Sequence, residues 1–510
     1  MSSKVFSAAV IGLNAELVEV EADISLGLPN FTVVGLPDTA VQESRERIRA
    51  ALKNSGILFP KTKITVNLAP ADLKKEGPSY DLPIAVSILL ASGDFKIPFA
   101  EIEKSLFLGE LALDGSLRPV HGVLPIAVSL KAKGIKTLYL PETNAAEAGL
   151  VPDFDIIPLK NLTQLVLHLK KEKDVELYER KETEFSDEAE INFDMKFIRG
   201  QEYAKRALEI AAAGGHNILM SGPPGSGKTL LARSFTTILP RMVLEEALEV
   251  TKIWSVAGVL PPEKPLLTSR PFRSPHHTAS GIALVGGGTN PKPGEISLAH
   301  RGVLFLDELP EFSRAVLENL RQPLEDGFVC VSRVSGTVRF PCRFILVAAR
   351  NPCPCGYSGD PAGKCHCSLT QILKYQRKIS GPLLDRIDIH IPVPKVEFEK
   401  IKTPVGESSA DVRNRIERAR ATQNKRFEGK RIFTNAEMNS QMTEEFCKVD
   451  EDSENLLRQA VNSVNLSMRG YYRTLKIART IADLSARENI ILKDVGDALN
   501  FRPKFEESFM

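Results

Sequence analysis

The 510-residue sequence lacks the features that mark membrane and secreted proteins. No apolar run approaches the roughly 18–20 residues that a membrane-spanning helix needs. The first six residues have neither the apolar core nor the small-residue cleavage site of a secretory signal. A strong charge of one sign is also missing, because the formal net charge is only +2. We therefore expect a cytoplasmic protein without a membrane contact, in which any DNA contact comes from a local basic surface.

Cysteine is scarce as well, with seven residues, of which four are crowded into one segment. Crowded thiols suit a metal site in a reducing compartment better than a disulfide framework. Zinc binds four soft ligands in a tetrahedron, and a loop can close on itself to supply them. Unligated thiols, a redox role and His366 in place of one thiol are the alternatives. The candidate zinc ligands are Cys353, Cys355, Cys365 and Cys367. The remaining cysteines are expected in the core, and they are Cys330, Cys342 and Cys447.

The most informative motif is a glycine-rich segment between a predicted strand, residues 217–220, and a predicted helix that starts at residue 230. Glycines let backbone N–H groups surround a β-phosphate, a lysine reaches the β- and γ-phosphate oxygens, and a threonine hydroxyl binds Mg²⁺. The segment therefore predicts a site for a nucleoside triphosphate and Mg²⁺. The predicted nucleotide-binding residues are Gly222, Pro223, Pro224, Gly225, Ser226, Gly227, Lys228 and Thr229.

A second motif is an apolar stretch, residues 302–306, that ends in two carboxylates, Asp307 and Glu308. Asp307 can hold the metal together with Thr229, and Glu308 can polarise the attacking water. A GTPase would orient that water with glutamine instead. Acids at a strand end often serve only solvation, but their position downstream of a phosphate loop favours hydrolysis. We predict an ATPase that uses ATP and Mg²⁺.

The chain is too long for one hydrophobic core and divides into four segments by composition. Residues 1–171 mix strands and helices, including a helix that Asp38 caps. Residues 172–195 are mostly charged and indicate a linker. Residues 196–395 form the nucleotide-binding core, and residues 396–510 are mostly helical, with Ser409 capping one helix. The expected fold class is therefore α/β with several domains.

Further motifs resemble those of AAA+ ATPases of the magnesium-chelatase and MCM branch. Asn351 follows an apolar strand, where AAA+ proteins carry sensor 1. Residues 381–388 resemble the stretch that supplies the arginine finger, which makes Arg386 the finger. Residues 472–475 resemble sensor 2, which makes Arg473 a contact to the γ-phosphate. The resemblance thus adds Asn351, Arg386 and Arg473 to Glu308 as expected catalytic residues.

The whole chain resembles the YifB/ComM family of magnesium-chelatase-like AAA+ proteins, through residues 273–277, 294–300 and 351–356. Members of the ComM kind are hexameric ATPases that migrate branched DNA during recombination and natural transformation. The resemblance therefore implies a homohexamer acting on branched or single-stranded DNA. An insert before Asp307, which also holds His276 and His277, and a hairpin over residues 329–339 would line its channel. The expected DNA contacts are the basic residues of these segments, Arg273, Lys292, Arg333 and Arg339.

The first segment resembles the α+β proteolytic domain of Lon, and the last resembles the helical lid of the chelatase family. Ser79 lies where Lon has its catalytic serine, but Leu124 lies where Lon has its catalytic lysine. A Ser–Lys dyad needs the amine as general base, and leucine cannot accept a proton. We therefore expect a Lon-like domain without peptidase activity.

Two other functions share parts of this pattern. A chelatase-type ATPase that remodels a protein partner would have the same core, and it would lack hydrolysis stimulated by DNA. An ATP-dependent protease of Lon type is disfavoured by Leu124. The leading hypothesis is an ATP-dependent motor that carries out DNA branch migration.

Overall fold

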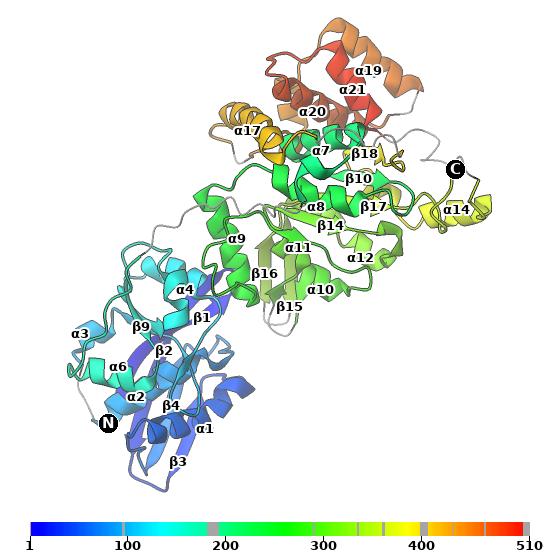
Figure 1. Ribbon diagram of the computed structural model, residues 1–510. Coiled ribbons are helices and arrows are strands. Elements are labelled where there is room, and N and C mark those ends of the chain that lie inside the picture. The colour runs from blue at the N-terminus through cyan, green and yellow to red at the C-terminus, as the bar shows by residue number, and fades with distance from the viewer. Residues whose placement is uncertain are drawn as a thin grey trace. The chain divides into compact units, whose positions relative to one another are not determined.

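The computed structural model divides into two compact units, each of which is described by itself (Figure 1). Unit 1 comprises Met1–Phe185 and Ala247–Leu267, and unit 2 comprises Ser186–Glu246 and Thr268–Met510. Among the helices in the described parts of the chain, none has the length and apolarity needed to cross a bilayer. The structure describes residues 2–93, 97–180, 193–288, 291–333, 336–359, 363–397, 406–430, 432–463 and 466–502.

Unit 1 is built on a four-stranded sheet with the order β1-β2-β4-β3. The pairs β1–β2 and β2–β4 are antiparallel, whereas β3 and β4 are parallel. A parallel sheet with the order β5-β8-β9 and the ribbon β6-β7 complete its strands. The strands are β1 Ser2–Ile11, β2 Asn14–Ser25, β3 Asn30–Val34, β4 Lys63–Ala69, β5 Ser105–Phe107, β6 Glu110–Leu111, β7 Leu117–Arg118, β8 Thr137–Pro141 and β9 Asp155–Leu159.

The helices of unit 1 pack on these strands. α2 lies against β1 and β2 and is buried along almost its whole length, because its sequence is apolar on every side. Asp38 caps α1 as predicted, since its Oδ1 accepts a hydrogen bond from the Val41 amide at 2.8 Å. The helices are α1 Thr39–Asn54, α2 Asp81–Ser92, α3 Phe99–Ile102, α4 Val123–Lys131, α5 Ala145–Ala148 and α6 Leu162–Leu169.

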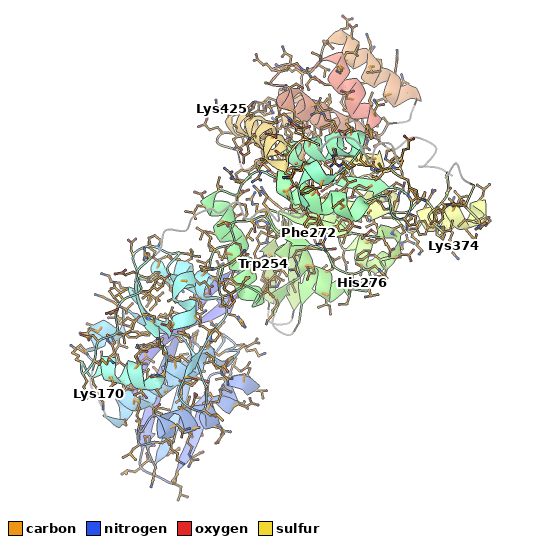
Figure 2. All side chains as sticks on the ribbon, in the orientation of Figure 1. Lys170, Trp254, Phe272, His276, Lys374 and Lys425 are labelled. Atoms are coloured by element: carbon orange, nitrogen blue, oxygen red, sulfur yellow. The ribbon has the colours of Figure 1, made fainter. Side chains whose placement is uncertain are left out.

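A later part of the chain also belongs to unit 1. Helix α9, Leu244–Ala257, begins at the end of one stretch of unit 2, and the chain returns to unit 2 at Thr268. Figure 2 labels Trp254 on this helix. The Ser255 hydroxyl accepts a hydrogen bond from the Gly122 amide at 3.0 Å and donates one to the buried Glu147 carboxylate. A segment that the sequence analysis assigned to the nucleotide-binding core therefore supplies a helix to unit 1.

Unit 2 contains a five-stranded sheet with the order β11-β14-β17-β10-β18, in which every neighbouring pair is parallel. The strands therefore end together at one side, the carboxyl edge, and begin together at the other, the amino edge. Ligands of open parallel sheets bind outside the carboxyl ends of the strands. The strands are β10 Ile218–Ser221, β11 Phe272–Arg273, β14 Val303–Leu306, β17 Ile345–Arg350 and β18 Ile389–Pro392.

Beside this sheet, helix α17 packs against α7 and α8, and helix α20 packs against α7 (Figure 1). The N-cap of α17 is Ser408, so the prediction that Ser409 caps this helix was wrong. Ser409 instead accepts a hydrogen bond from the Met195 amide at 2.8 Å. The longer helices of unit 2 are α7 Glu202–Gly214, α8 Lys228–Ile238, α14 Leu369–Gln376, α17 Ser409–Arg426, α18 Ser440–Phe446, α19 Glu451–Ser463, α20 Met468–Leu484 and α21 Leu492–Asn500.

Short helices and two hairpins connect these elements. The antiparallel hairpin β15–β16 covers the hairpin predicted over residues 329–339. The short helices are α10 Gly281–Val285, α11 Glu295–Leu298, α12 Arg314–Glu318, α13 Arg321–Asp326 and α15 Gly381–Leu384. The hairpin strands are β12 Gly286–Gly287, β13 Lys292–Pro293, β15 Phe328–Arg333 and β16 Gly336–Pro341.

Candidate nucleotide site

The glycine-rich segment turns from β10 into α8 at the carboxyl edge of the sheet. Lys228 is the first residue of α8, and its Nζ donates to the carbonyl oxygens of Gly222 at 2.8 Å and Pro223 at 2.9 Å. Burial lowers the pKa of Lys228, against the opposing effect of Asp307 and Glu308. These neutral carbonyl acceptors hold the ammonium group where phosphate oxygens would replace them.

Gly222 fits a position that no larger residue can occupy. A Cβ atom there would lie 2.1 Å from the carbonyl oxygen of Val393, which follows β18. The Gly222 amide donates to the Arg350 carbonyl at the end of β17, at 3.2 Å. The first residue of the loop is therefore fixed between the two strands that flank β10.

Asp307 and Glu308 follow β14 at the same edge. The Thr229 hydroxyl donates to Asp307 Oδ2 at 3.0 Å, so the two predicted Mg²⁺ ligands lie together. Glu308 has a left-handed backbone with φ of 50°, which is uncommon outside glycine and recurs at functional sites. Its carboxylate lies 3.8 Å from His277 Nδ1. The sequence showed no carboxylate near this histidine, and the fold supplies one.

Asn351 joins the same cluster from the neighbouring strand. It follows β17, which lies between β10 and β14, and its Oδ1 accepts a hydrogen bond from Lys228 Nζ at 3.2 Å. Three strand ends thus bring Lys228, Thr229, Asp307, Glu308 and Asn351 to one place. This arrangement can bind a nucleotide–metal complex and hold a water beside its terminal phosphate.

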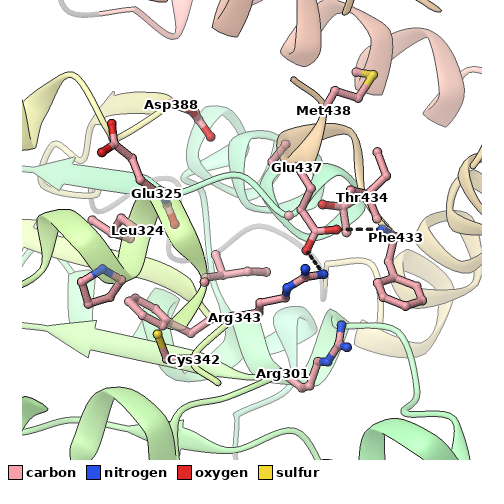
Figure 3. A pocket seen from close by; sticks show the side chains of 18 of the residues that line it. Arg301, Leu324, Glu325, Cys342, Arg343, Asp388, Phe433, Thr434, Glu437 and Met438 are labelled. Atoms are coloured by element: carbon pink, nitrogen blue, oxygen red, sulfur yellow. Dashed lines mark hydrogen bonds and ion pairs between the residues drawn. The ribbon is translucent and has the colours of Figure 1, made fainter. Parts of the chain in front are cut away.

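The two predicted catalytic arginines lie at the amino edge instead. They line a cavity of about 490 Å³, together with residues at the start of four strands. Figure 3 shows this cavity from close by, with Glu325 and Asp388 among its lining residues. Arg386 is almost fully buried and forms an ion pair with Glu325. Arg473 donates to Asp388 Oδ1 at 2.6 Å. The strand-start residues are Asn217, Gly302, Ile345 and Asp388.

Asp388 is the centre of a buried network at this edge. Burial acts to raise the pKa of its carboxyl group, but Arg473 and His216 outweigh burial and hold the pKa well below its usual range. His216 contacts Asp388 at 3.2 Å and Thr480 at 2.9 Å, so the network joins β18 to α20. Asp388 therefore fixes where Arg473 points.

Arginines and glutamates also face each other across the cavity wall. Figure 3 shows Arg343 directed at Glu437, with 3.4 Å between Nη1 and Oε1, and Arg301 beside Phe433. The guanidinium of Arg301 lies 4.8 Å from the centre of the Phe433 ring. The amino edge is therefore rich in arginines that already have partners within the chain.

The expected DNA contacts differ in accessibility. Lys292 and Arg339 are exposed on β13 and β16, and the Arg339 guanidinium lies over the Phe328 ring. Arg273 forms a two-bond ion pair with Glu295, at 2.6 and 2.7 Å, so a phosphate would have to compete with this carboxylate. Arg333 pairs with Gly336 through the backbone register, and its side chain lies outside the described residues.

The four crowded cysteines meet as predicted, with their sulfur atoms within 4.8 Å of one another. Sulfur–sulfur distances are 3.3 Å for Cys353–Cys355, 3.8 Å for Cys353–Cys365 and 3.6 Å for Cys355–Cys365. A tetrahedron with zinc–sulfur bonds of about 2.3 Å has edges of about 3.8 Å, so the group can hold a metal. Cys342 and Cys447 are buried as expected, whereas Cys330 is exposed because it lies on the hairpin, and its assignment to the core was wrong.

Sequence reasoning missed three partners that the fold supplies. Glu325, Asp388 and His277 lie far along the chain from the residues they contact. Asp388 could have been predicted as a site residue from the sequence, because it belongs to the same segment as the predicted arginine finger. The sequence did not indicate Glu325, and it placed His277 in the insert before Asp307 without indicating its contact with Glu308.

Comparisons with known proteins show the family of the chain. Residues 194–401 match the family described as "Magnesium chelatase, subunit ChlI", residues 20–144 match "Subunit ChlI of Mg-chelatase", and residues 406–502 match its C-terminal region. The competence protein ComM of Haemophilus influenzae is 45% identical over 98% of this chain and 97% of its own length. The protein YifB of Escherichia coli is 43% identical, with the same coverage of both chains.

A local similarity covers a smaller part of the chain. A Lon protease of Aster yellows witches'-broom phytoplasma is 26% identical over 29% of this chain and 20% of its own. The similarity to ComM and YifB, by contrast, runs through both units. The chain belongs to the YifB/ComM family of magnesium-chelatase-like proteins.

Proposed function

We propose that this protein is an ATP-hydrolysing AAA+ motor that assembles as a homohexamer and drives branch migration of DNA. The observation that carries the proposal is the separation of two sets of residues on one sheet. The nucleotide-binding residues lie at the carboxyl edge, and Arg386 and Arg473 line a cavity at the amino edge. The four-residue strand β10 alone keeps the two edges about 13 Å apart.

This separation favours a head-to-tail ring. A heterologous contact that closes into a ring brings one surface of each subunit against a different surface of the next. Arg386 and Arg473 of one subunit would then face the γ-phosphate bound by its neighbour. An arginine that stabilises the transition state in this way contributes about 10³–10⁵ in rate.

At the carboxyl edge, each residue has a defined task. Mg²⁺, held by Thr229 and Asp307, would neutralise charge on the phosphates when bound. Lys228 would exchange its carbonyl acceptors for phosphate oxygens. Glu308 would take the proton of the attacking water, and Asn351, next to Lys228, would orient that water or the γ-phosphate.

DNA contacts are proposed on the hairpins of unit 2. Lys292 and Arg339 are exposed there and suit phosphate groups, which carry no sequence information. Arg333 is proposed as a contact because it lies on the same hairpin as Arg339, and Arg273 would reach a phosphate only by leaving Glu295. The name of the ComM relative refers to competence, and we propose the same process for this chain.

Four further assignments complete the proposal. The four cysteines would bind one structural zinc ion, since their spacing fits a tetrahedral site. The helices of residues 396–510 would act as an AAA+ lid. Residues 1–171 would form a Lon-like domain without peptidase activity, because Leu124 is fully buried at the position of the catalytic lysine. Residues 172–195 would be the linker.

The test is a junction assay with the assembled protein. Wild-type protein should convert three-way and four-way DNA junctions into duplex products in the presence of ATP and Mg²⁺, and DNA should stimulate hydrolysis. Glu308→Gln should bind ATP and DNA but leave the junctions intact.

A second function has one specific observation in its favour, because all three matched family descriptions name a subunit of magnesium chelatase. Such a protein would use ATP to remodel a protein partner. If assembled wild-type protein hydrolyses ATP normally yet neither binds nor resolves junctions at low salt, this alternative should replace the DNA motor.

A further inference from the structure

The segment that carries the four cysteines lies directly on the glycine-rich segment, residues 222–229, which we call the phosphate-binding loop. We call residues 352–367 the cysteine loop; the structure describes all of it except residues 360–362. It follows β17 and Asn351, whose Oδ1 contacts Lys228 at 3.2 Å. The strand that leads into the cysteine loop is therefore already bonded to the nucleotide site.

A second contact comes from inside the cysteine loop. Gly356 has φ of 83°, and a Cβ atom there would lie 2.5 Å from Cδ and 2.7 Å from Cγ of Pro224. The turn before it is closed by a hydrogen bond from the Gly356 amide to the Cys353 carbonyl, at 2.9 Å. Gly356 thus presses the backbone beside Cys355 against the ring of Pro224, in the middle of the phosphate-binding loop.

A third contact fixes the start of that loop. The Gly222 amide donates to the Arg350 carbonyl, three residues before Cys353, at 3.2 Å. Three separate contacts, at Gly222, Pro224 and Lys228, therefore connect the phosphate-binding loop to residues 350–356. A displacement of the cysteine loop would change the shape of the cradle that the phosphates enter.

Within the described part of the cysteine loop, the four thiols converge on one point. Cys353 is fully buried and accepts a hydrogen bond from the Ser358 amide at 3.2 Å, while Cys355, Cys365 and Cys367 are partly exposed. Where ligands converge in this way, the free energy of metal binding becomes free energy of folding for the segment.

We infer that a soft metal ion bound by the four cysteines acts as a positioning clamp on the phosphate-binding loop, so that nucleotide affinity depends on the metal. The clamp works through Gly356 against Pro224 and through Asn351 against Lys228. It rests on the proposed function in two respects, namely that this loop binds ATP and that the cysteines bind zinc.

The decisive test alters the contact and keeps the metal. Gly356→Ala should retain one zinc per chain and weaken the binding of a fluorescent ATP analogue by roughly tenfold, because an added methyl group overpacks a filled site. Gly359→Ala is the matched control. Gly359 lies in the same loop with φ of 79°, but a Cβ atom there meets nothing within 4 Å. Its zinc content and nucleotide affinity should equal those of wild type.

A complementary test removes the metal and keeps the contact residues. Cys365→Ser should lose zinc by elemental analysis and bind the analogue more weakly, while its circular dichroism spectrum stays that of a folded protein. Cys330→Ser, on the hairpin, should keep both zinc and affinity.

The outcomes separate this inference from the proposed function. If wild-type protein binds the analogue and zinc, yet Gly356→Ala matches Gly359→Ala and Cys365→Ser keeps full affinity, the clamp is refuted and the ATPase stands. Wild-type protein that binds the analogue but carries no metal after purification under reducing conditions also refutes the clamp alone. Wild-type protein that fails to bind nucleotide refutes both.

Discussion

The two edges of the parallel sheet in unit 2 hold their charged residues in different ways. At the carboxyl edge, Lys228 donates to two backbone carbonyl oxygens and to the side-chain oxygen Oδ1 of Asn351, and all three acceptors are uncharged. At the amino edge, Arg386 and Arg473 are paired with carboxylates, Glu325 and Asp388. A carboxylate acceptor adds the attraction of an opposite charge, which a neutral carbonyl acceptor lacks.

This difference indicates how each edge meets phosphate. Under the proposed function, a nucleotide at the carboxyl edge would displace neutral acceptors and would need no other subunit. A nucleotide that reaches the amino edge must compete with carboxylates for the arginines, so this edge suits an encounter that only assembly provides. Under the proposed function, the chain would carry one half of a catalytic site at each edge, and a ring would join unlike halves.

The strongest test of this comparison mixes defects from the two edges. Arg386→Ala should bind ATP normally and hydrolyse it about 10³–10⁵ times more slowly. Mixing equal amounts with Lys228→Ala should restore about a quarter of the wild-type rate in a ring of heterologous interfaces, since some interfaces pair an intact loop with an intact arginine. The measurement is steady-state hydrolysis of mixed hexamers.

Mixtures within one edge provide the control. Lys228→Ala with Glu308→Gln, or Arg386→Ala with Arg473→Ala, should gain nothing on mixing, because every interface keeps a defective half. The assignment of the two edges to different halves of the site would be contradicted by restored hydrolysis in these mixtures. It would also be contradicted by a lack of restored hydrolysis when variants of the two edges are mixed. Arg377→Ala, an exposed arginine just after α14, should behave as wild type.

A smaller effect is expected at the catalytic carboxylate. Glu308→Gln should slow hydrolysis by about 10²–10⁴, the contribution of a positioned general base, while leaving the affinity for ATP unchanged. Single-turnover hydrolysis with bound nucleotide measures this step. An unchanged rate would show that a residue other than Glu308 acts as the general base.

At the amino edge, the predicted effect is on the free energy of unfolding. Asp388→Asn should lower the free energy of unfolding by about 3 kcal/mol at neutral pH, since it breaks a buried ion pair. The pKa of Asp388 is depressed in the folded protein, so its contribution is present above its unfolded pKa of about 3.9 and is lost as the pH falls below that value. Denaturant titrations at pH 7 and near pH 3 should show the difference between the two proteins shrinking in acid.

The smallest effect is expected in unit 1. Ser79→Ala should change neither ATP hydrolysis nor junction processing, and wild-type protein should not cleave casein. ATP-dependent cleavage that Ser79→Ala abolishes would show that a base other than the residue at position 124 activates this serine.

The sequence predicted the carboxyl edge well because its residues belong to short continuous motifs. Gly222 to Thr229, Asp307 with Glu308, and Asn351 each follow an apolar stretch, and parallel strands bring such positions together. The grouping of the four cysteines was predictable for the same reason, since all four lie within residues 353–367.

The amino edge was only partly predictable because its pairs join distant segments. Family resemblance identified Arg386 and Arg473, but nothing local to them indicated Glu325 on α13 or His216 after α7. The contribution of α9 to unit 1 was missed for a similar reason, since its helical pattern does not reveal which core it joins. Local propensity predicts elements, and the tertiary fold selects their partners.

The path of α9 has a consequence for synthesis on the ribosome. Unit 1 is completed by Ala247–Leu267, and Ser255 supplies one of the hydrogen bonds that satisfy the buried Glu147. Chains emerge from their N-termini, so the first unit waits for residues encoded after the phosphate-binding loop before its last helix can dock. A nascent chain halted before residue 247 lacks that helix and leaves the Gly122 amide without the Ser255 hydroxyl. The N-terminal unit thus reaches its final state only after residues 186–246 of unit 2 have been made.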